Sequence, residues 1–415
     1  MALPRCSSSQ TGSGSDRSEK HAEGSIVSAP TTPPIYLDYH ATTPVDPRVA
    51  AVVLRAMTTD FGNANSTEHV YGEVAAELVR EARRHVAALV GSDPDAVNFT
   101  SGSSESIRLA VAHALSNCSE RPLRVAVTEV EHRAVLDAVG AHEARGEVTV
   151  RWVPVDYQAR LDLAALEAAC REGVDLVCVM AANNEVGTVY PIEEVGRIAG
   201  RVGARTLIDA TQAAGHVPLE ADGWRITYLA LSAHKIYGPK GVGALIAPPE
   251  LDLRPSHHGV PGVGDGTPNV PGIAGLGEAC RLRRIEWSVD ESRMATQRDR
   301  LEALLLAGVD GLVVNGDRKH RLSNNLHVAV PGAPNNAVIA RLRRHVALSS
   351  GAACSSGAEA PSHVLRAMGL SKDVQDSALR IGTGKFTTDE EVERAAEQIT
   401  STVALIRDAL QGALV

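Results

Sequence analysis

The sequence predicts an α/β protein, with a mostly parallel central sheet in a large domain and a second, smaller α+β domain. The chain has 415 residues, which exceeds the roughly 250–300 residues at which single hydrophobic cores stop growing. Between 97 and 247, short apolar runs alternate with helical patterns, as is typical of parallel strands covered by helices on both faces. Several polar clusters follow directly after these runs, at the strand ends where such sheets bind ligands.

The N-terminal residues 1–33 are rich in Ser, Gly, Thr and Pro and are predicted to be disordered. They contain no apolar h-region, and the acidic residues Asp16, Glu19 and Glu23 are unlike a transit peptide. We therefore interpret them as an extension rather than a targeting signal. Next come a helix from 47 to 58, with proline in its first turn, and an amphipathic helix over 72–90.

Seven strands and four helices are predicted in the alternating region. The strands are expected at 97–100, 124–128, 148–153, 176–180, 206–209, 227–231 and 243–247, and the helices at 104–116, 134–144, 163–171 and 193–202. Beyond 271 the pattern predicts a helix to about 306, strands at 312–314 and 324–330, a helix at 336–344, a loop, and a final helix over 388–410. We expect a large domain over 45–293 and a small domain formed by 34–44 and 294–415.

Composition excludes several classes of protein. The net charge of −9 and the lack of a basic block argue against nucleic acid as a partner. No apolar run reaches the roughly 18 residues that a membrane span needs. The six cysteines show no metal-ligand spacing, so we expect no resident metal and reduced thiols, as in a cytoplasm.

The segment 227–241, TYLALSAHKIYGPKG, is typical of a short strand that ends at a polar cluster around Lys235. An amine there, beside Ser232 and His234, suits the binding of an aldehyde as a Schiff base, because desolvation favours the neutral nucleophile. Pyridoxal 5′-phosphate is the aldehyde cofactor that stabilises carbanions in this way. A surface lysine is the ordinary alternative. Lysine is scarce in this chain, and Lys385 is the only serious rival.

Three other strand ends carry groups that suit the ring of this cofactor. Asp209 ends a strong apolar strand, where a carboxylate is costly unless paired, and a protonated pyridine nitrogen is a suitable partner. Gln212 and Asn184 could hydrogen-bond the ring oxygen, and His132 could stack on the ring or shuttle protons. The ordinary alternatives are a helix cap for Asp209, a turn for Asn184 and a structural role for His132.

The segment 100–106, TSGSSES, follows a strand and opens a helix. The amides and hydroxyls of Ser103 and Ser104 would face an anion such as the cofactor phosphate, although a simple serine N-cap has the same sequence. Cys354 lies in a loop of small residues rather than an apolar run, as expected of a reachable, reactive thiol. Arg380 could clamp a substrate carboxylate in bidentate fashion.

Taken in order, these segments identify a family. The chain resembles the pyridoxal-phosphate cysteine desulfurases of the nitrogen-fixation and iron–sulfur-cluster type, within the class V aminotransferases. The resemblance extends from about 36 to 404. It rests on 37–44 (LDYHATTP), 100–106, 183–187 (NNEVG), 209–212 (DATQ), 232–241 (SAHKIYGPKG) and 349–354 (SSGAAC).

The resemblance implies fold type I, a homodimer with active sites at the subunit interface, and conversion of L-cysteine to L-alanine. By motif match Lys235 is the Schiff-base lysine, Asp209 the pyridine partner and Cys354 the sulfur acceptor and a candidate transient iron–sulfur ligand. The resemblance also implies that Asn184, Gln212 and His132 contact the cofactor ring. The cofactor phosphate would be bound by Ser104, Ser232, His234 and the other subunit's Thr267. The substrate would be bound by Arg380 and Asn184.

Two departures from the family pattern stand out. Ser103 and Ser104 replace an Ala-Thr pair but keep a hydroxyl, whereas Gly264 stands where the family has an arginine. A selenocysteine lyase, another class V enzyme and a non-catalytic cofactor-binding paralogue are the alternative functions. The sulfur acceptor is expected to be a protein such as an iron–sulfur scaffold or a tRNA-thiolation enzyme.

Overall fold

The computed structural model describes residues 33–118, 121–249, 266–351 and 362–412. Its largest feature is a seven-stranded sheet, in which β8 is antiparallel to both neighbours and all other pairings are parallel. The strands, in spatial order, are β2 (Val97–Thr100), β8 (Gly243–Ile246), β7 (Tyr228–Ser232), β6 (Arg205–Asp209), β5 (Leu176–Met180), β3 (Leu123–Thr128) and β4 (Val148–Val153). The predicted mostly parallel sheet is therefore confirmed.

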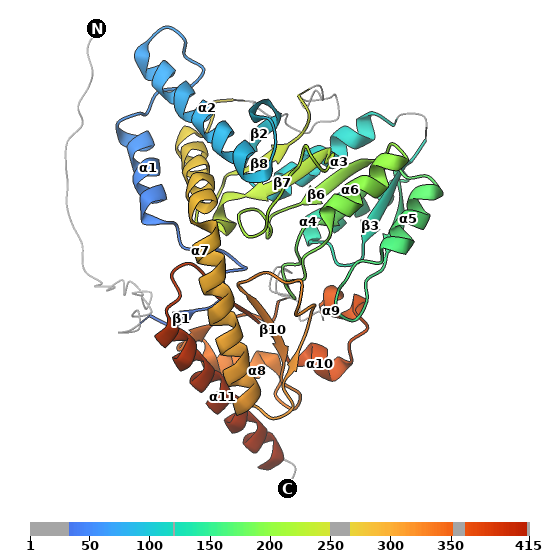
Figure 1. Ribbon diagram of the computed structural model, residues 1–415, viewed down its shortest axis with the longest axis vertical. Helices are drawn as coiled ribbons and strands as arrows, with labels where there is room; N and C mark the ends of the chain where they lie inside the picture. The colour runs from blue at the N-terminus through green and yellow to red at the C-terminus, as the bar shows by residue number, and fades with distance from the viewer. Residues whose placement is uncertain (1–32, 119–120, 250–265, 352–361, 413–415) are drawn as a thin grey trace, which may run out of the picture. The chain divides into compact units, whose positions relative to one another are not determined.

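Helices cover both faces of this sheet (Figure 1). In β5, Leu176 and Cys178 belong to one buried apolar cluster, and Val177 and Val179 belong to another. Successive side chains on a strand point to opposite faces, so each face of the sheet has its own apolar core. The helices that follow the parallel strands are α3 (Ser103–Ser116), α4 (Arg133–Glu143), α5 (Leu163–Arg171) and α6 (Ile192–Arg201).

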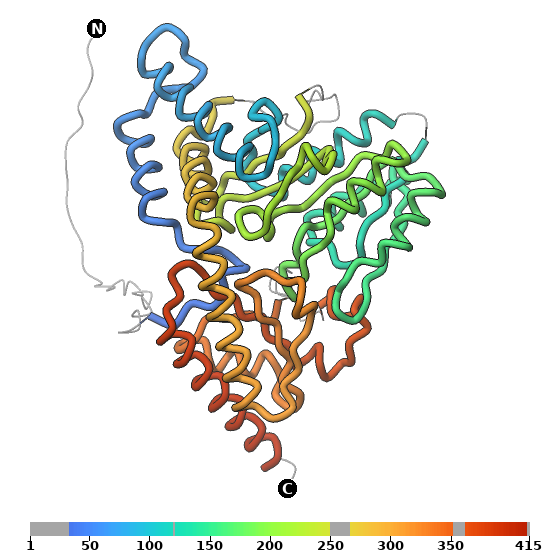
Figure 2. Tube along the Cα trace, viewed as in Figure 1, coloured from blue at the N-terminus to red at the C-terminus, as the bar shows by residue number. Residues whose placement is uncertain are grey.

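The C-terminal region forms a third buried cluster that also takes in Ile35 and Leu37. Here β1 (Ile35–Tyr36) pairs in parallel with β11 (Val346–Ala347), which joins the start of the described chain to its C-terminal region. Figure 2 follows this return of the early chain to the C-terminal part. The remaining elements are β10 (Asn325–Ala329), antiparallel to β9 (Val313–Val314) and β12 (Ala378–Gly382), with helices α8 (Asn335–Leu342) and α11 (Asp389–Gly412).

One long helix, α7 (Val270–Gly308), connects these two regions. It packs against α1 (Pro47–Thr58) and α2 (Val70–Val90) beside the large sheet, and against α11 at the other end (Figure 1). The expected helices over 47–58, 72–90 and 271–306 are therefore confirmed. The domain boundaries stay a prediction, and the predicted disorder of 1–33 falls almost wholly outside the described residues.

The prediction of a loop between 345 and 387 is wrong in part. This stretch contains β11, β12, α9 (His363–Ala367) and α10 (Lys372–Asp376). The two helices have five residues each, too few to show a helical repeat in the sequence. All five residues of β12 are buried against β10, so its formation depends on pairing with a distant segment.

Candidate active site

Four neighbouring parallel strands deliver polar side chains to one edge of the large sheet. Lys235 follows β7, Asp209 ends β6, Asn184 follows β5 and His132 follows β3. The spatial order β7-β6-β5-β3 places these strands side by side. Because parallel strands end at the same edge, the structure brings together the groups that the sequence analysis assigned to a cofactor ring.

Lys235 ends a short 3₁₀ turn, η2 (Ala233–Lys235), directly after β7. Its Nζ donates to the carbonyl oxygen of Ala41 at 2.8 Å and to that of His40. The amine is half-buried and held against the segment that connects β1 to α1. It therefore lies at a strand end near other polar groups, as expected of a lysine that binds an aldehyde.

Lys385, the rival lysine, is occupied elsewhere. Its Nζ lies 2.8 Å from Asp46 Oδ2 and also pairs with Glu286. Its side chain is only 11% exposed. Lys385 is therefore paired with two carboxylates that belong to none of the predicted cofactor-binding segments.

Asp209 is buried at the end of β6. Its Oδ1 accepts a hydrogen bond from Thr211 N at 3.0 Å and another from the Thr211 hydroxyl. Thr211 was not predicted as a functional residue, although it lies inside the DATQ segment. Because these bonds orient the carboxylate, Asp209 is suited to pair with a protonated ring nitrogen.

A second buried carboxyl, Glu131, lies beside His132. Its Oε1 accepts hydrogen bonds from the Thr128 hydroxyl at 2.6 Å and from Met180 N at 2.8 Å. Burial raises the pKa of Glu131 to about 8, and the charge of Asp209 adds to this shift. The sequence analysis did not identify Glu131, because nothing in the sequence indicates that this glutamate is buried.

The imidazole of His132 has a defined tautomer in this arrangement. Its Nδ1 accepts a hydrogen bond from Ala134 N at 3.1 Å, as the N-cap of α4. In the neutral ring the proton is then on Nε2.

The start of α3 lines a cavity of about 410 Å³. Gly102 is the N-cap of this helix and makes no side-chain cap hydrogen bond, and the N–H groups of a first helical turn have no partner within the helix. The polar residues that line the cavity include Ser103, Ser104, Ser232, His234, Arg108 and Lys240, and also Glu105, whose carboxylate accepts from Ser101 N. Hydroxyls, helix N–H groups and two cations are a donor set that fits a phosphate.

His234 lies within this cavity with its Nδ1 3.2 Å from the Thr42 hydroxyl. Burial, together with the positive charges of Lys235 and Lys240, lowers the pKa of His234 to about 4. The ring is therefore neutral near pH 7 and can bind a phosphate only as a hydrogen-bond donor.

Gln212 is buried against His40. Its Nε2 donates to the His40 carbonyl oxygen at 3.0 Å, and its Oε1 lies 3.1 Å from His40 Nδ1. Burial lowers the pKa of His40 to about 3, so this imidazole is neutral and donates to the amide. The amide of Gln212 thus holds the segment that also contacts Lys235.

Arg380 lies on β12 and is almost fully buried. Its Nη1 donates to the Asn184 carbonyl oxygen at 3.0 Å, and its Nη2 lies 2.9 Å from Asp38 Oδ1. Its Nε has no hydrogen-bond partner among the described residues. A buried donor without a partner is costly, and a substrate carboxylate could supply the missing acceptor.

Three residues singled out in the sequence remain to be placed. Thr267 is exposed on the segment before α7. Cys354 and Gly264 lie outside the described residues. In the described part of the chain, no cluster of three or more His, Cys, Asp or Glu side chains could hold a metal ion. None of the described helices is long and apolar enough to cross a membrane.

A mostly parallel sheet covered by helices, with a lysine and a cavity that fits a phosphate at its strand ends, is the architecture of the fold-type-I, pyridoxal-phosphate-dependent class. The profile of the aminotransferase class-V family matches residues 35–395. The chain belongs to this family, whose enzymes depend on pyridoxal phosphate.

Three known proteins illustrate the similarity. The chain is 44% identical over 381 residues to cysteine desulfurase IscS of Anaeromyxobacter sp. (strain Fw109-5), covering 90% of this chain and 94% of the relative. A solved NifS-like protein superposes with a TM-score of 0.81 at 32% identity, covering 90% of this chain and 100% of the other. A structure of SspA in complex with cysteine gives a TM-score of 0.73 at 28% identity, covering 86% and 100%.

Proposed function

We propose that this protein is a cysteine desulfurase, which converts L-cysteine to L-alanine and transfers the sulfur to Cys354 as a persulfide. One observation supports this above the others. The strand that carries Arg380 pairs with the residues that lead to Cys354, because Arg380 N donates to Ser349 O at 2.7 Å. Because Arg380 Nη1 also donates to the Asn184 carbonyl oxygen after β5, this pairing supports a substrate guanidinium and a cysteine segment that act at the same strand ends.

Pyridoxal phosphate would be held by residues from three parts of the site. Lys235 would bind it covalently, Asp209 would pair with its ring nitrogen, and the start of α3 with Ser232 and His234 would bind its phosphate. When bound, this cofactor supplies an electron-withdrawing ring that stabilises negative charge at the substrate Cα.

The protein's own groups would then act on L-cysteine. Arg380 would bind the carboxylate through its Nε edge, which orients the Cα–H bond toward Lys235. The Lys235 amine would take the Cα proton, and a proton transferred through His132 Nε2 is expected to contribute about 10²–10⁴-fold. Asn184, whose carbonyl oxygen accepts from Arg380, would place its side chain near the ring oxygen.

The sulfur transfer balances without an external oxidant. The Cys354 thiolate forms a bond to the substrate sulfur while the Cβ–S bond breaks. The electron pair of that bond stays on carbon, which takes up a proton and becomes the methyl group of alanine. The sulfur of Cys354 is oxidised to the persulfide level as the carbon is reduced.

The test is steady-state product analysis of the purified holoenzyme with L-cysteine and a thiol that removes persulfide. We expect alanine and sulfide in equal amounts from the parent, and no sulfide above background from Cys354→Ala. If Cys354→Ala forms sulfide at the parent rate, or if the parent forms no alanine, the proposal is wrong.

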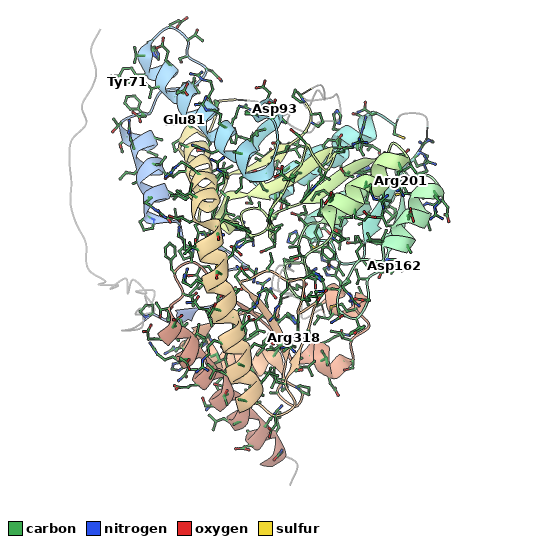
Figure 3. All side chains as sticks on the ribbon, viewed as in Figure 1. Tyr71, Glu81, Asp93, Asp162, Arg201 and Arg318 are labelled. Carbon is green, nitrogen blue, oxygen red and sulfur yellow. The ribbon has the colours of Figure 1, made fainter. Side chains whose placement is uncertain are left out.

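The proposal includes a homodimer and a persulfide acceptor protein. Exposed apolar side chains on α1, α2 and the loop between them support a protein interface there: Leu54, Met57, Phe61, Val70 and Tyr71. Tyr71 lies at the outer end of α2 (Figure 3). In the dimer Thr267 would reach the phosphate of the partner's cofactor, and sedimentation analysis of Phe61→Asp would test the interface.

We also retain the division into a large domain, 45–293, and a small domain formed by 34–44 and 294–415. The separate buried cluster that contains Ile35 and Leu37 supports it.

A further inference from the structure

Glu185 is a buried carboxylate that none of the steps above uses. It lies in the turn after β5, within the NNEVG segment, and is only 3% exposed. The described chain stops at Gly351 and resumes at Ser362, and Glu185 contacts both of these residues. The segment between them contains Cys354.

On the C-terminal side, the Ser362 hydroxyl donates to Glu185 Oε2 at 2.6 Å. The same hydroxyl oxygen accepts from Leu365 N at 3.2 Å, as the N-cap of α9. A hydroxyl has one proton to donate, and here Glu185 accepts it. The hydrogen bond to Glu185 therefore fixes the position of Ser362, the residue at which α9 begins.

On the N-terminal side, the backbone of Gly351 passes directly against Glu185. A Cβ added to Gly351 would lie 3.1 Å from Oε2, and its φ of +87° is one that residues with side chains rarely adopt. Two residues earlier, Ser349 is paired with Arg380 through both backbone hydrogen bonds. The chain is thus held by backbone hydrogen bonds at Ser349, two residues before Gly351 packs against the Glu185 carboxylate.

Glu185 is itself fixed by the turn that carries it. Its backbone N–H donates to Asn183 Oδ1 at 2.9 Å, and its carbonyl oxygen accepts from Asn325 Nδ2 at 3.0 Å. Burial raises the pKa of Glu185, while the hydrogen bond from Ser362 and the positive charge of Arg380 oppose that shift. The backbone of Glu185 is thus held by hydrogen bonds to the turn after β5 and to β10, and its carboxyl accepts from Ser362.

We propose that Glu185 is a positioning residue for sulfur transfer, which sets the separation and direction of the two chain ends that carry the Cys354 segment. This inference rests on the proposed function only for the role of Cys354. It requires that Glu185 act as a hydrogen-bond acceptor at Ser362 and as a surface against which Gly351 packs.

The test compares Glu185→Ala with Glu185→Gln in the holoenzyme, because the glutamine side chain has the same length and keeps an acceptor oxygen. With L-cysteine, Glu185→Ala is expected to slow persulfide formation on Cys354 by about 10- to 100-fold, the cost of misplacing a reacting group by roughly 1 Å. KM for cysteine and cofactor content are expected to stay near the parent values. Glu185→Gln is expected to retain most of the rate, as is the exposed control Glu193→Ala.

Amide hydrogen exchange gives a second readout that needs no substrate. Glu185→Ala is expected to speed exchange in peptides covering 346–351 and 362–370, with no change in peptides from α2. Ser362→Ala is expected to behave in the same way, whereas Ser371→Ala, at the N-cap of α10, is not. A parent-like persulfide rate and parent-like exchange in Glu185→Ala would overturn the inference.

The two hypotheses fail differently. If the parent makes no alanine from cysteine, the proposed function is wrong. The exchange experiment would still report whether Glu185 holds both chain ends.

Discussion

The buried carboxyl of Glu131 allows a quantitative prediction, because its pKa is raised from 4.5 to about 8. A raised pKa in the folded state means that folding favours the protonated form. The stability that this group contributes is fully present below pH 4.5 and is lost as the pH rises through 8. Near pH 7, roughly 2.5 pH units above the ordinary pKa and at about 1.4 kcal/mol per unit, the buried group costs about 3–4 kcal/mol of stability.

Glu131→Gln removes this cost. The amide oxygen can accept the two hydrogen bonds that Oε1 accepts from Thr128 and Met180. We expect the Tm of Glu131→Gln to exceed that of the parent by a few degrees at pH 8, and by much less at pH 5.

The assay is thermal unfolding of the holoenzyme between pH 5 and pH 9, with the exposed Glu193→Gln as a control for the change in net charge. The decisive quantity is the difference in Tm between variant and parent at each pH. If this difference is the same at pH 5 and pH 8, Glu131 is not protonated on folding and the reasoning is refuted.

Three further predictions concern the cofactor and the substrate. Lys235→Ala is expected to abolish covalent attachment of pyridoxal phosphate after borohydride reduction, as measured by peptide mass; attachment at Lys385 would contradict the assignment. Arg380→Lys is expected to raise KM for cysteine about tenfold or more, because a lysine loses the bidentate geometry; an unchanged KM in the steady-state assay would remove Arg380 from the substrate site. Lys385→Met is expected to remove one of the two cations paired with the buried Asp46, leaving Arg48, and to lower Tm by a few degrees, with cofactor attachment retained; an unchanged Tm would show that this ion pair contributes no stability.

The sequence predicted the grouping of the site because strand order and strand ends follow from local patterns. Four of the apolar runs between 97 and 232 are closely followed by a polar group of the site, and parallel pairing brings these ends to one edge. Lys235, Asp209, Asn184 and His132 could therefore be grouped from the sequence. The reversed direction of β8 could not, since its run of Gly243–Ile246 has the same composition as a parallel strand.

Groups that depend on burial were not predicted. Glu131 and Glu185 are ordinary glutamates in the sequence, and only the packing of distant segments encloses them. The amide of Gln212 was expected to face the cofactor ring, but which partner it contacts depends on where the chain near His40 lies. Such contacts join residues more than a hundred positions apart, so no local pattern records them.

The most direct test of the account is a single turnover of the holoenzyme with one equivalent of L-cysteine, followed by mapping of the sulfur on the chain. The account predicts one alanine per active site and one added sulfur atom on the peptide that contains Cys354, removable by a reducing thiol. Alanine without sulfur on that peptide, or sulfur on a different cysteine, would contradict it.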